Sequence, residues 1–397
     1  MMEQGKYFIV CLCAAVFLAC STALPATAEG SITSAPSATR WSGELTAGDR
    51  LTIDRCVEIA LKRSPALRSA SGAVNAGKSR VGQARSAWYP QVTLSGGYSK
   101  YSLLADPTNS VQDQYTANAA LTQNLFDFGR TWNQVTVQQK NAAAASEDLR
   151  SVTSDIVLNV KQAYYGLLRA EKNRDVLKET MKSFERHLEQ ARGFFEAGVK
   201  SKFDVTKADV DLSNARLTLI RAENALRIAR VTLNNAMGVP EAPEYAIEDT
   251  LAFQKRAITF EEARDRAYAN RPDVRALAAR REAAEAAVSL ARSNYYPSLT
   301  GNAVYTRTED TYPPEPSGWS AGVTLTVPLF SGFLTNNQVR EAKENLVIAK
   351  ANEDALKQGA LLEVQQSFLN LQEAEERVAV AELTVKQAEE NYEIAKG

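Results

Sequence analysis

The chain contains an internal duplication, and this feature limits most strictly the folds that it can adopt. Ser64-Pro65 in the first half matches Arg271-Pro272 in the second, and Trp88-Tyr89-Pro90 matches Tyr295-Tyr296-Pro297. Pro65 and Pro272 are 207 positions apart, as are Pro90 and Pro297. A unit of this size is too long for a repeat solenoid, whose units contain about 20–50 residues. We therefore expect one architecture with two similar, fused halves.

Each half contains two short segments in which apolar and polar side chains alternate. The segments are 90–103 and 115–126 in the first half and 297–307 and 318–329 in the second. In the first of them, for example, Val92 and Leu94 flank Thr93. A period of two is typical of a β-strand with one apolar and one polar face. We therefore predict two β-hairpins, four strands in all, in a protein that is mainly α with a small β part.

Long helices account for most of the remaining sequence. No proline interrupts residues 133–195, which would span about 90 Å as a helix. Apolar residues there recur at steps of three and four, as in a coiled-coil seam. Residues 203–237 repeat this spacing without a break, and large and small side chains alternate at the contact positions: Val205, Ala208, Leu212, Ala215, Leu219, Ala222, Leu226, Ala229, Leu233 and Ala236. We predict a long antiparallel coiled-coil hairpin, duplicated in the second half.

The N-terminus has the features of a secretory signal. Lys6 precedes an apolar run, and Ala26-Thr27-Ala28 provides the small residues that signal peptidase prefers. We expect cleavage after Ala28. The alternative is cleavage before Cys20 with lipidation of that cysteine. Both alternatives predict that the protein is exported.

These features divide the chain into five parts. They are a signal peptide (1–28), a flexible leader (29–50), a first copy of the repeat (51–238), a connector (239–257) and a second copy (258–397). Gly397 corresponds to Gly193, and the first copy continues from there to Gly238. We therefore expect the second copy to be incomplete and the sequence to be a fragment.

The sequence contains no recognisable catalytic constellation. His187 is the only histidine, and its position within a predicted helix favours a solvated surface residue. No Cys or His pair has the spacing of a metal site. The net charge is −1, which gives no indication of nucleic-acid binding. We expect neither an enzyme nor a cofactor, metal or nucleic-acid partner.

The four predicted strands have features of membrane-spanning strands, which contain about 9–11 residues. Aromatic residues gather near their ends, as in the girdles of outer-membrane barrels: Tyr89, Tyr98, Tyr101, Tyr115, Phe126, Tyr296, Tyr305, Trp319 and Phe330. Four strands cannot close a barrel, and an unpaired strand edge is excluded from lipid. We therefore predict a homotrimer with twelve strands in outer-membrane lipid. Packing of the apolar faces on a soluble core is the alternative.

Several motifs together resemble one known family. They include Leu125-Phe126-Asp127-Phe128-Gly129, Pro328-Leu329-Phe330-Ser331-Gly332, and Phe195-Glu196-Ala197-Gly198-Val199 followed by Asp204-Val205. In this order and in a duplicated frame, they resemble the outer-membrane efflux proteins of the TolC type, from residue 51 to 397. The resemblance implies a trimeric 12-stranded β-barrel in the outer membrane, continued by a periplasmic α-barrel.

The same resemblance implies a function and partners. It implies a passive channel of a tripartite efflux or type I secretion system, which meets an inner-membrane transporter through a periplasmic adaptor. A loop at the helical tip would contact the adaptor, through Gly198, Val199, Lys200, Ser201, Asp204 and Val205. An ordinary helix turn, with Gly198 and Asp204 as caps, is compatible with this role. The family's gate residues would lie beyond Gly397. A periplasmic coiled-coil scaffold without a channel is the alternative function.

Overall fold

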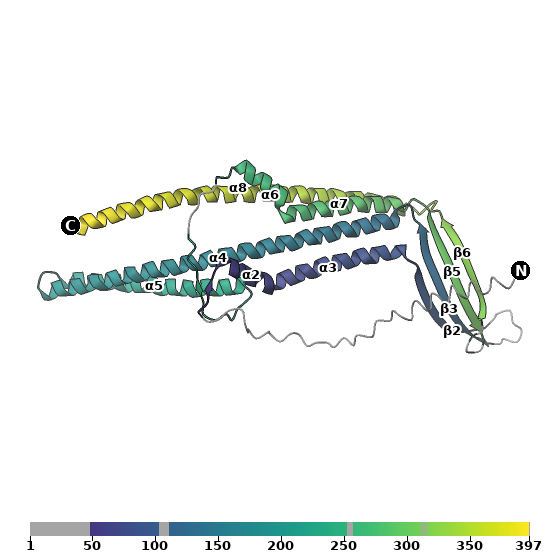
Figure 1. Ribbon diagram of the computed structural model, residues 1–397, viewed down its shortest axis with the longest axis horizontal. Coiled ribbons are helices and arrows are strands. Elements are labelled where there is room, and N and C mark those ends of the chain that lie inside the picture. Colours follow the sequence, from purple (N-terminus) through teal and green to yellow (C-terminus); the bar gives the residue numbers. More distant parts are fainter. Residues whose placement is uncertain are drawn as a thin grey trace. The chain divides into compact units, whose positions relative to one another are not determined.

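The computed structural model describes residues 48–102, 111–251, 257–310, 312, 314 and 316–396 (Figure 1). Ala28, Cys20 and the rest of the predicted signal peptide lie outside the described residues, as does most of the predicted leader. The chain divides into two compact units, and one of them holds every helix and strand described below. This unit is mainly helical with a small sheet, which confirms the predicted fold class.

The four predicted strands join into one antiparallel sheet. They are β2 (Gln91–Ser102), β3 (Val111–Phe126), β5 (Ser298–Glu309) and β6 (Pro316–Thr326), in the order β2-β3-β5-β6. The two hairpins therefore pair with each other, through β3 and β5. Strand β3 begins four residues before the predicted start, because residues 111–114 continue the ladder with β2. Strand β6 ends at Thr326 rather than 329, and Pro328 lacks the N–H needed to extend it.

Helices make up most of the rest of the unit. Around the first hairpin they are α2 (Ile53–Arg63), α3 (Pro65–Arg85), the short 3₁₀ helix η1 (Ser86–Trp88), α4 (Arg130–Glu196) and α5 (Lys202–Ala236). Around the second they are α6 (Phe260–Asn270), α7 (Pro272–Ser293) and α8 (Leu334–Lys396). None of the helices described is both long and apolar enough to cross a membrane.

Helix starts follow the repeat. Helices α3 and α7 both have proline at their first position, where the missing N–H costs no hydrogen bond. Ser64 caps α3 by accepting a hydrogen bond from the backbone N–H of Leu67 at 3.4 Å. Arg271 holds the same place before α7 without a side-chain cap. The two copies therefore share the start signal and differ in the cap.

Helices α4 and α5 form the predicted antiparallel pair (Figure 1). All ten seam residues predicted on α5 are buried or partly buried, whereas Val210 and Ile220 on its other side are exposed. Near the turn, Leu188 and Ala191 of α4 pack with Ala208 and Leu212 of α5. Helix α4 also packs against α3 and α7, and α7 packs against α8. The coiled-coil interpretation of this segment is confirmed.

A small junction ties the connector to the first copy. Strand β1 (Arg50–Leu51) pairs in parallel with β4 (Ala246–Ile247). The hydroxyl of buried Tyr164 on α4 lies 2.7 Å from the carbonyl oxygen of Glu248 and 3.1 Å from that of Leu51. Cys56 on α2 is fully buried nearby, and this burial raises the pKa of its thiol to about 11. The cysteine acts here as a small apolar core residue.

Candidate membrane sheet and helical tip

The register of the sheet sorts its side chains onto two faces. Residues directly opposite each other on neighbouring strands point to the same face. One row across all four strands is Val92, Leu121, Ala303 and Ala321, and the next is Leu94, Ala119, Tyr305 and Trp319. We call this side the apolar face. The alternation seen within each strand is therefore continuous across the sheet.

None of the helices that the structure describes covers the apolar face. Leu94 is 84% exposed, Trp319 is 65% exposed and Val323 is 63% exposed. A contiguous apolar surface of this kind marks a site of contact with lipid or another protein. Within this chain the apolar face therefore does not pack on a soluble core, which was the alternative expectation.

The opposite side, which we call the polar face, is lined by hydroxyl and amide groups. One complete row is Gln91, Thr122, Asn302 and Gly322. Neighbouring side chains on this face make long hydrogen bonds, for example from the Thr324 hydroxyl to Asn302 Oδ1 at 3.5 Å. Such groups retain hydrogen-bonding capacity for water. The two faces of the sheet thus suit an apolar and an aqueous environment.

Aromatic residues cluster at both ends of the sheet. Beside the helices, the ring of Phe128 lies 4.7 Å from that of Phe126 and 5.8 Å from that of Tyr296. At the end near the hairpin loops, Tyr115 lies 5.1 Å from Tyr98 and 5.7 Å from Tyr312. All four distances between ring centroids are in the range of favourable aromatic pairs. These clusters bound the apolar face.

The spacing of the bounding tyrosines is the same in both copies. Tyr89 and Tyr98 are nine positions apart, as are Tyr296 and Tyr305. Tyr89 and Tyr296 precede β2 and β5, so the alternation within the strands does not fix the face on which they lie. Nine extended residues span about 31 Å, or about 23 Å in height at a strand tilt of about 40°. That height is close to the apolar band of about 25 Å in outer-membrane barrels.

Two of the predicted interface aromatics, Tyr101 and Phe330, do not lie on the apolar face of a strand. Tyr101 lies opposite Gln112 on the polar face, with its hydroxyl 3.3 Å from Gln112 Oε1. It therefore cannot belong to a lipid-facing girdle, because three positions separate it from Tyr98 and an odd step changes the face. Phe330 lies beyond the end of β6, is exposed, and packs against Phe333 at 5.6 Å.

The junctions between the sheet and the long helices use the same device in both copies. Asp127 accepts hydrogen bonds from the backbone N–H groups of Gly129 and Thr131, at 3.2 Å and 2.8 Å. In the second copy, Ser331 accepts from the N–H of Thr335 at 3.4 Å. The two residues after each acceptor have positive φ, and each pair contains one glycine and one phenylalanine.

Hydrogen bonds also set the charge state of this junction. Burial raises the pKa of Asp127, but hydrogen bonds from Thr131, Asn124 and Gly129 outweigh burial and hold the pKa below its usual range. The carboxylate therefore stays ionised at the N-terminus of α4, where the helix dipole favours negative charge.

The predicted tip is a tightly defined turn between α4 and α5. Gly198 has φ of +75°, and the N–H groups of Gly198 and Val199 donate to the carbonyls of Phe195 and Phe194 at 2.9 Å and 2.8 Å. This is a Schellman motif, and its positive φ favours glycine. The Ser201 N–H and hydroxyl donate to Asp204 Oδ2 at 3.1 Å and 2.8 Å.

The cap of α5 differs in one detail from the expected one. Ser201 is the N-cap residue, and Asp204 reaches back to it from the third helical position. The hydrogen bonds from Ser201 hold the pKa of Asp204 below its usual range. Val199 and Phe203 extend from the turn and are 71% and 74% exposed. The tip therefore combines a rigid backbone with two unpacked apolar side chains.

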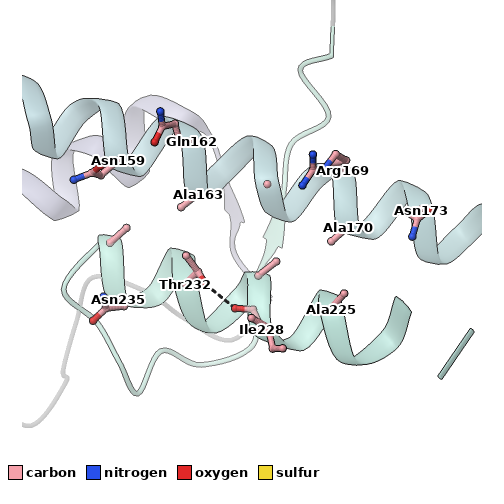
Figure 2. Close-up of a pocket in the computed structure, with 13 residues that line it drawn as sticks. Asn159, Gln162, Ala163, Arg169, Ala170, Asn173, Ala225, Ile228, Thr232 and Asn235 are labelled. Carbon is pink, nitrogen blue, oxygen red and sulfur yellow. Dashed lines mark hydrogen bonds between the residues drawn. The ribbon is translucent and has the colours of Figure 1, made fainter. Parts of the chain in front are cut away.

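A groove of about 880 Å³ lies along α4 and α5 (Figure 2). Ala163 and Ala170 line it from α4, and Ala225 from α5, so that small side chains leave the space open. Arg169 is the one charged residue in its lining. The sequence predicted close approach of these helices but not an open groove.

The described residues contain no group of three or more His, Cys, Asp or Glu side chains that could hold a metal ion. His187 is exposed on α4. The arrangement can therefore offer two surfaces of different polarity and an apolar tip, but no evident reactive centre within the described part of the chain.

Comparison with known proteins gives four similarities. The outer membrane efflux protein family matches residues 56–239 and 263–397. The chain is 27% identical over 315 residues to outer membrane protein TolC of Vibrio cholerae serotype O1, covering 77% of this chain and 71% of TolC. It is 23% identical over 348 residues to alkaline protease secretion protein AprF of Pseudomonas aeruginosa, covering 83% of this chain and 72% of AprF. The crystal structure of outer membrane protein VceC from Vibrio cholerae has the same fold, with a TM-score of 0.72 at 20% identity over 85% of this chain and 83% of VceC.

Proposed function

Because the chain belongs to the outer membrane efflux protein family, we propose that it is the exit duct of a tripartite efflux or type I secretion system. The family is located in the outer membrane, and the helices extend into the periplasm. The observation that carries the proposal is the uncovered apolar face of the sheet, bounded at both ends by aromatic clusters. Lipid is the environment that such a face requires.

Oligomerisation is needed to complete the duct. Strands β2 and β6 are the two edges of the sheet and run in opposite directions. Strand β6 of one copy can therefore pair antiparallel with β2 of the next. Three copies would give a closed barrel of twelve strands, without an edge exposed to lipid. The polar faces would then line an aqueous lumen.

The duct would act passively, with energy supplied by its partners. We place the periplasmic adaptor at the tip between α4 and α5, where Val199 and Phe203 offer exposed apolar side chains on a rigid turn. An inner-membrane transporter would engage through this adaptor. The description of the family supports efflux as the class of process, and the relative AprF, an alkaline protease secretion protein, supports secretion.

Fractionation tests the duct against the scaffold alternative. Full-length protein should enter the membrane fraction, need detergent for extraction, and run near three times the monomer mass on an unheated gel. A protein that is soluble without detergent as a monomer or dimer would contradict the channel and favour a periplasmic scaffold.

Charge substitutions test the tip. Gly198→Asp and Val199→Asp should abolish efflux while the amount of trimer stays unchanged, because they place charge on the apolar contact. His187→Asp is the matched control, since it adds the same charge to an exposed position on α4 outside the turn. Normal efflux by the Val199 variant would contradict the adaptor contact and leave the turn as an ordinary helix connection.

A further inference from the structure

The polar face of the sheet is hydrophilic but carries no charged side chain within the four strands. Three complete rows cross all four strands on this face. They are Gln91, Thr122, Asn302 and Gly322; Thr93, Ala120, Val304 and Ser320; and Ser95, Asn118, Thr306 and Gly318. The positions above and below these rows are also neutral.

The absence of charge is specific to this face. Asp, Glu, Lys and Arg make up 23% of the chain, so that roughly every fourth position of a water-exposed surface would be expected to carry one. The strands do contain four charged residues, Lys100, Asp113, Arg307 and Glu309. The register places all four on the side of the apolar face, near the loop end. Lys100 and Asp113 pair there at 3.3 Å.

Charges on the polar face would act on most of the lumen. Twelve strands about 4.8 Å apart, with a tilt of about 40°, enclose a tube with a backbone radius of about 12 Å. The Debye length is about 8 Å at physiological ionic strength. A fixed charge on the wall would therefore attract or repel passing ions across much of the cross-section. A wall of hydroxyl and amide groups has no such effect.

We infer that the sheet section of the duct does not select its cargo by charge. This inference rests on the proposed function, because it takes the polar face as the lumen. The wall offers only neutral side chains, most of them hydroxyl and amide groups, so cationic, anionic and zwitterionic solutes and polypeptide segments of either sign pass this section equally. Any charge selection by the whole duct is then set outside the four strands.

Thiol labelling measures the local potential directly. Asn302→Cys places a thiol in the middle of the polar face of the full-length protein in outer membranes. Its rates with a cationic and an anionic methanethiosulfonate reagent are each divided by the rate with a free thiol in solution. The two normalised rates should agree within about threefold. Wild-type protein, in which Cys56 is buried, gives the background.

Two further variants make the result interpretable. Gly322 lies opposite Asn302 and has open space around it, so Gly322→Asp adds a charge without a clash. Combined with Asn302→Cys, it should favour the cationic reagent by about tenfold, as expected for a charge one strand away in screened water. Val323→Cys places the thiol on the apolar face and should react with neither reagent.

The outcomes separate the inference from the proposed function. Equal normalised rates at Asn302→Cys, with the expected bias after Gly322→Asp, support a neutral lumen. A bias of more than about tenfold without the added charge would overturn the inference and leave the duct intact. Reaction at Val323→Cys but not at Asn302→Cys would instead overturn the assignment of the faces, and with it the proposed duct.

Discussion

The Asp127 carboxylate accepts two hydrogen bonds from Thr131, one from the Thr131 backbone N–H at 2.8 Å and one from the Thr131 hydroxyl. This contact fixes the first turn of α4 directly after β3. Ser331 and Thr335 repeat it at the start of α8, with a hydroxyl in place of the carboxylate. The sheet and the long helices are thereby joined by two rigid corners rather than by flexible loops.

Removing the acceptor should loosen one corner. Asp127→Ala should destabilise the protein by about 1–2 kcal/mol, the usual cost of losing a helix cap. Asp127→Ser should lose less, because Ser331 already performs this role in the second copy. Samples heated to a series of temperatures before electrophoresis would give the temperature at which the trimer of each variant dissociates. Equal stability of Asp127→Ala and wild type would show that the corner does not depend on this contact.

The same carboxylate should give a pH dependence. Its folded-state pKa lies below the unfolded value of about 3.9, so its stabilising contribution is complete above that pH. The contribution is lost as the pH falls through the folded pKa. The difference in melting temperature between wild type and Asp127→Ser should therefore shrink below about pH 4. A difference that stays constant down to pH 2 would contradict this assignment.

Lysine substitutions at two adjacent positions of β6 should have different effects on trimer assembly. Val323→Lys places a charge on the apolar face and should cost about 2–4 kcal/mol in a membrane, depending on its depth. Thr324→Lys points to the polar face and should leave trimer assembly intact, because water can solvate it. The trimer yield in the outer membrane compares the two variants. Equal loss in both would contradict the assignment of the faces.

An ion pair between α7 and α8 should be replaceable by a pair of apolar side chains. Glu353 is buried and bonds Arg281 at 2.8 Å and Lys357 at 2.7 Å. The two copies are offset by 207 positions before the hairpins and by 204 after them, as Leu125 and Leu329 show. By these offsets, the first copy has Val74 and Leu149 at the positions of Arg281 and Glu353. Glu353→Leu alone should cost about 1–3 kcal/mol, since it leaves Arg281 with one partner fewer.

The double variant Arg281→Val with Glu353→Leu should recover at least half of that loss, because apolar pairs of suitable size often replace buried ion pairs. Thermal unfolding of the two single variants and the double variant completes the cycle. Additive losses would show that the two side chains are not energetically coupled.

Tyr164→Phe should weaken the junction between the connector and the first copy. The change removes the hydroxyl that meets the carbonyl oxygens of Leu51 and Glu248, at a cost of about 1–3 kcal/mol. Hydrogen exchange should accelerate at residues 50–51 and 246–248 and stay unchanged in the turn around Gly198. Unchanged exchange throughout would contradict a role for this hydroxyl in holding the connector.

The sequence by itself determined the features that depend on neighbouring residues along the chain. Alternation of side chains assigned the two faces of each strand, and steps of three and four assigned the seam of α4 and α5. Gly198 marked the turn, because few other residues adopt its positive φ. The duplication showed that these elements occur twice. Each of these signals is local, so the amino-acid order is sufficient to find it.

Only the tertiary structure decided how distant segments meet. The pairing of Ala119 with Tyr305 joins the two hairpins across more than 180 positions, and no periodicity within either strand specifies it. The pairing of β2 with β3 likewise extends β3 to Val111 and sets Lys100 opposite Asp113. Registers of this kind depend on the summed contacts of two strands, which neither strand contains alone. The faces were therefore readable from the sequence, whereas the single sheet that they form was not.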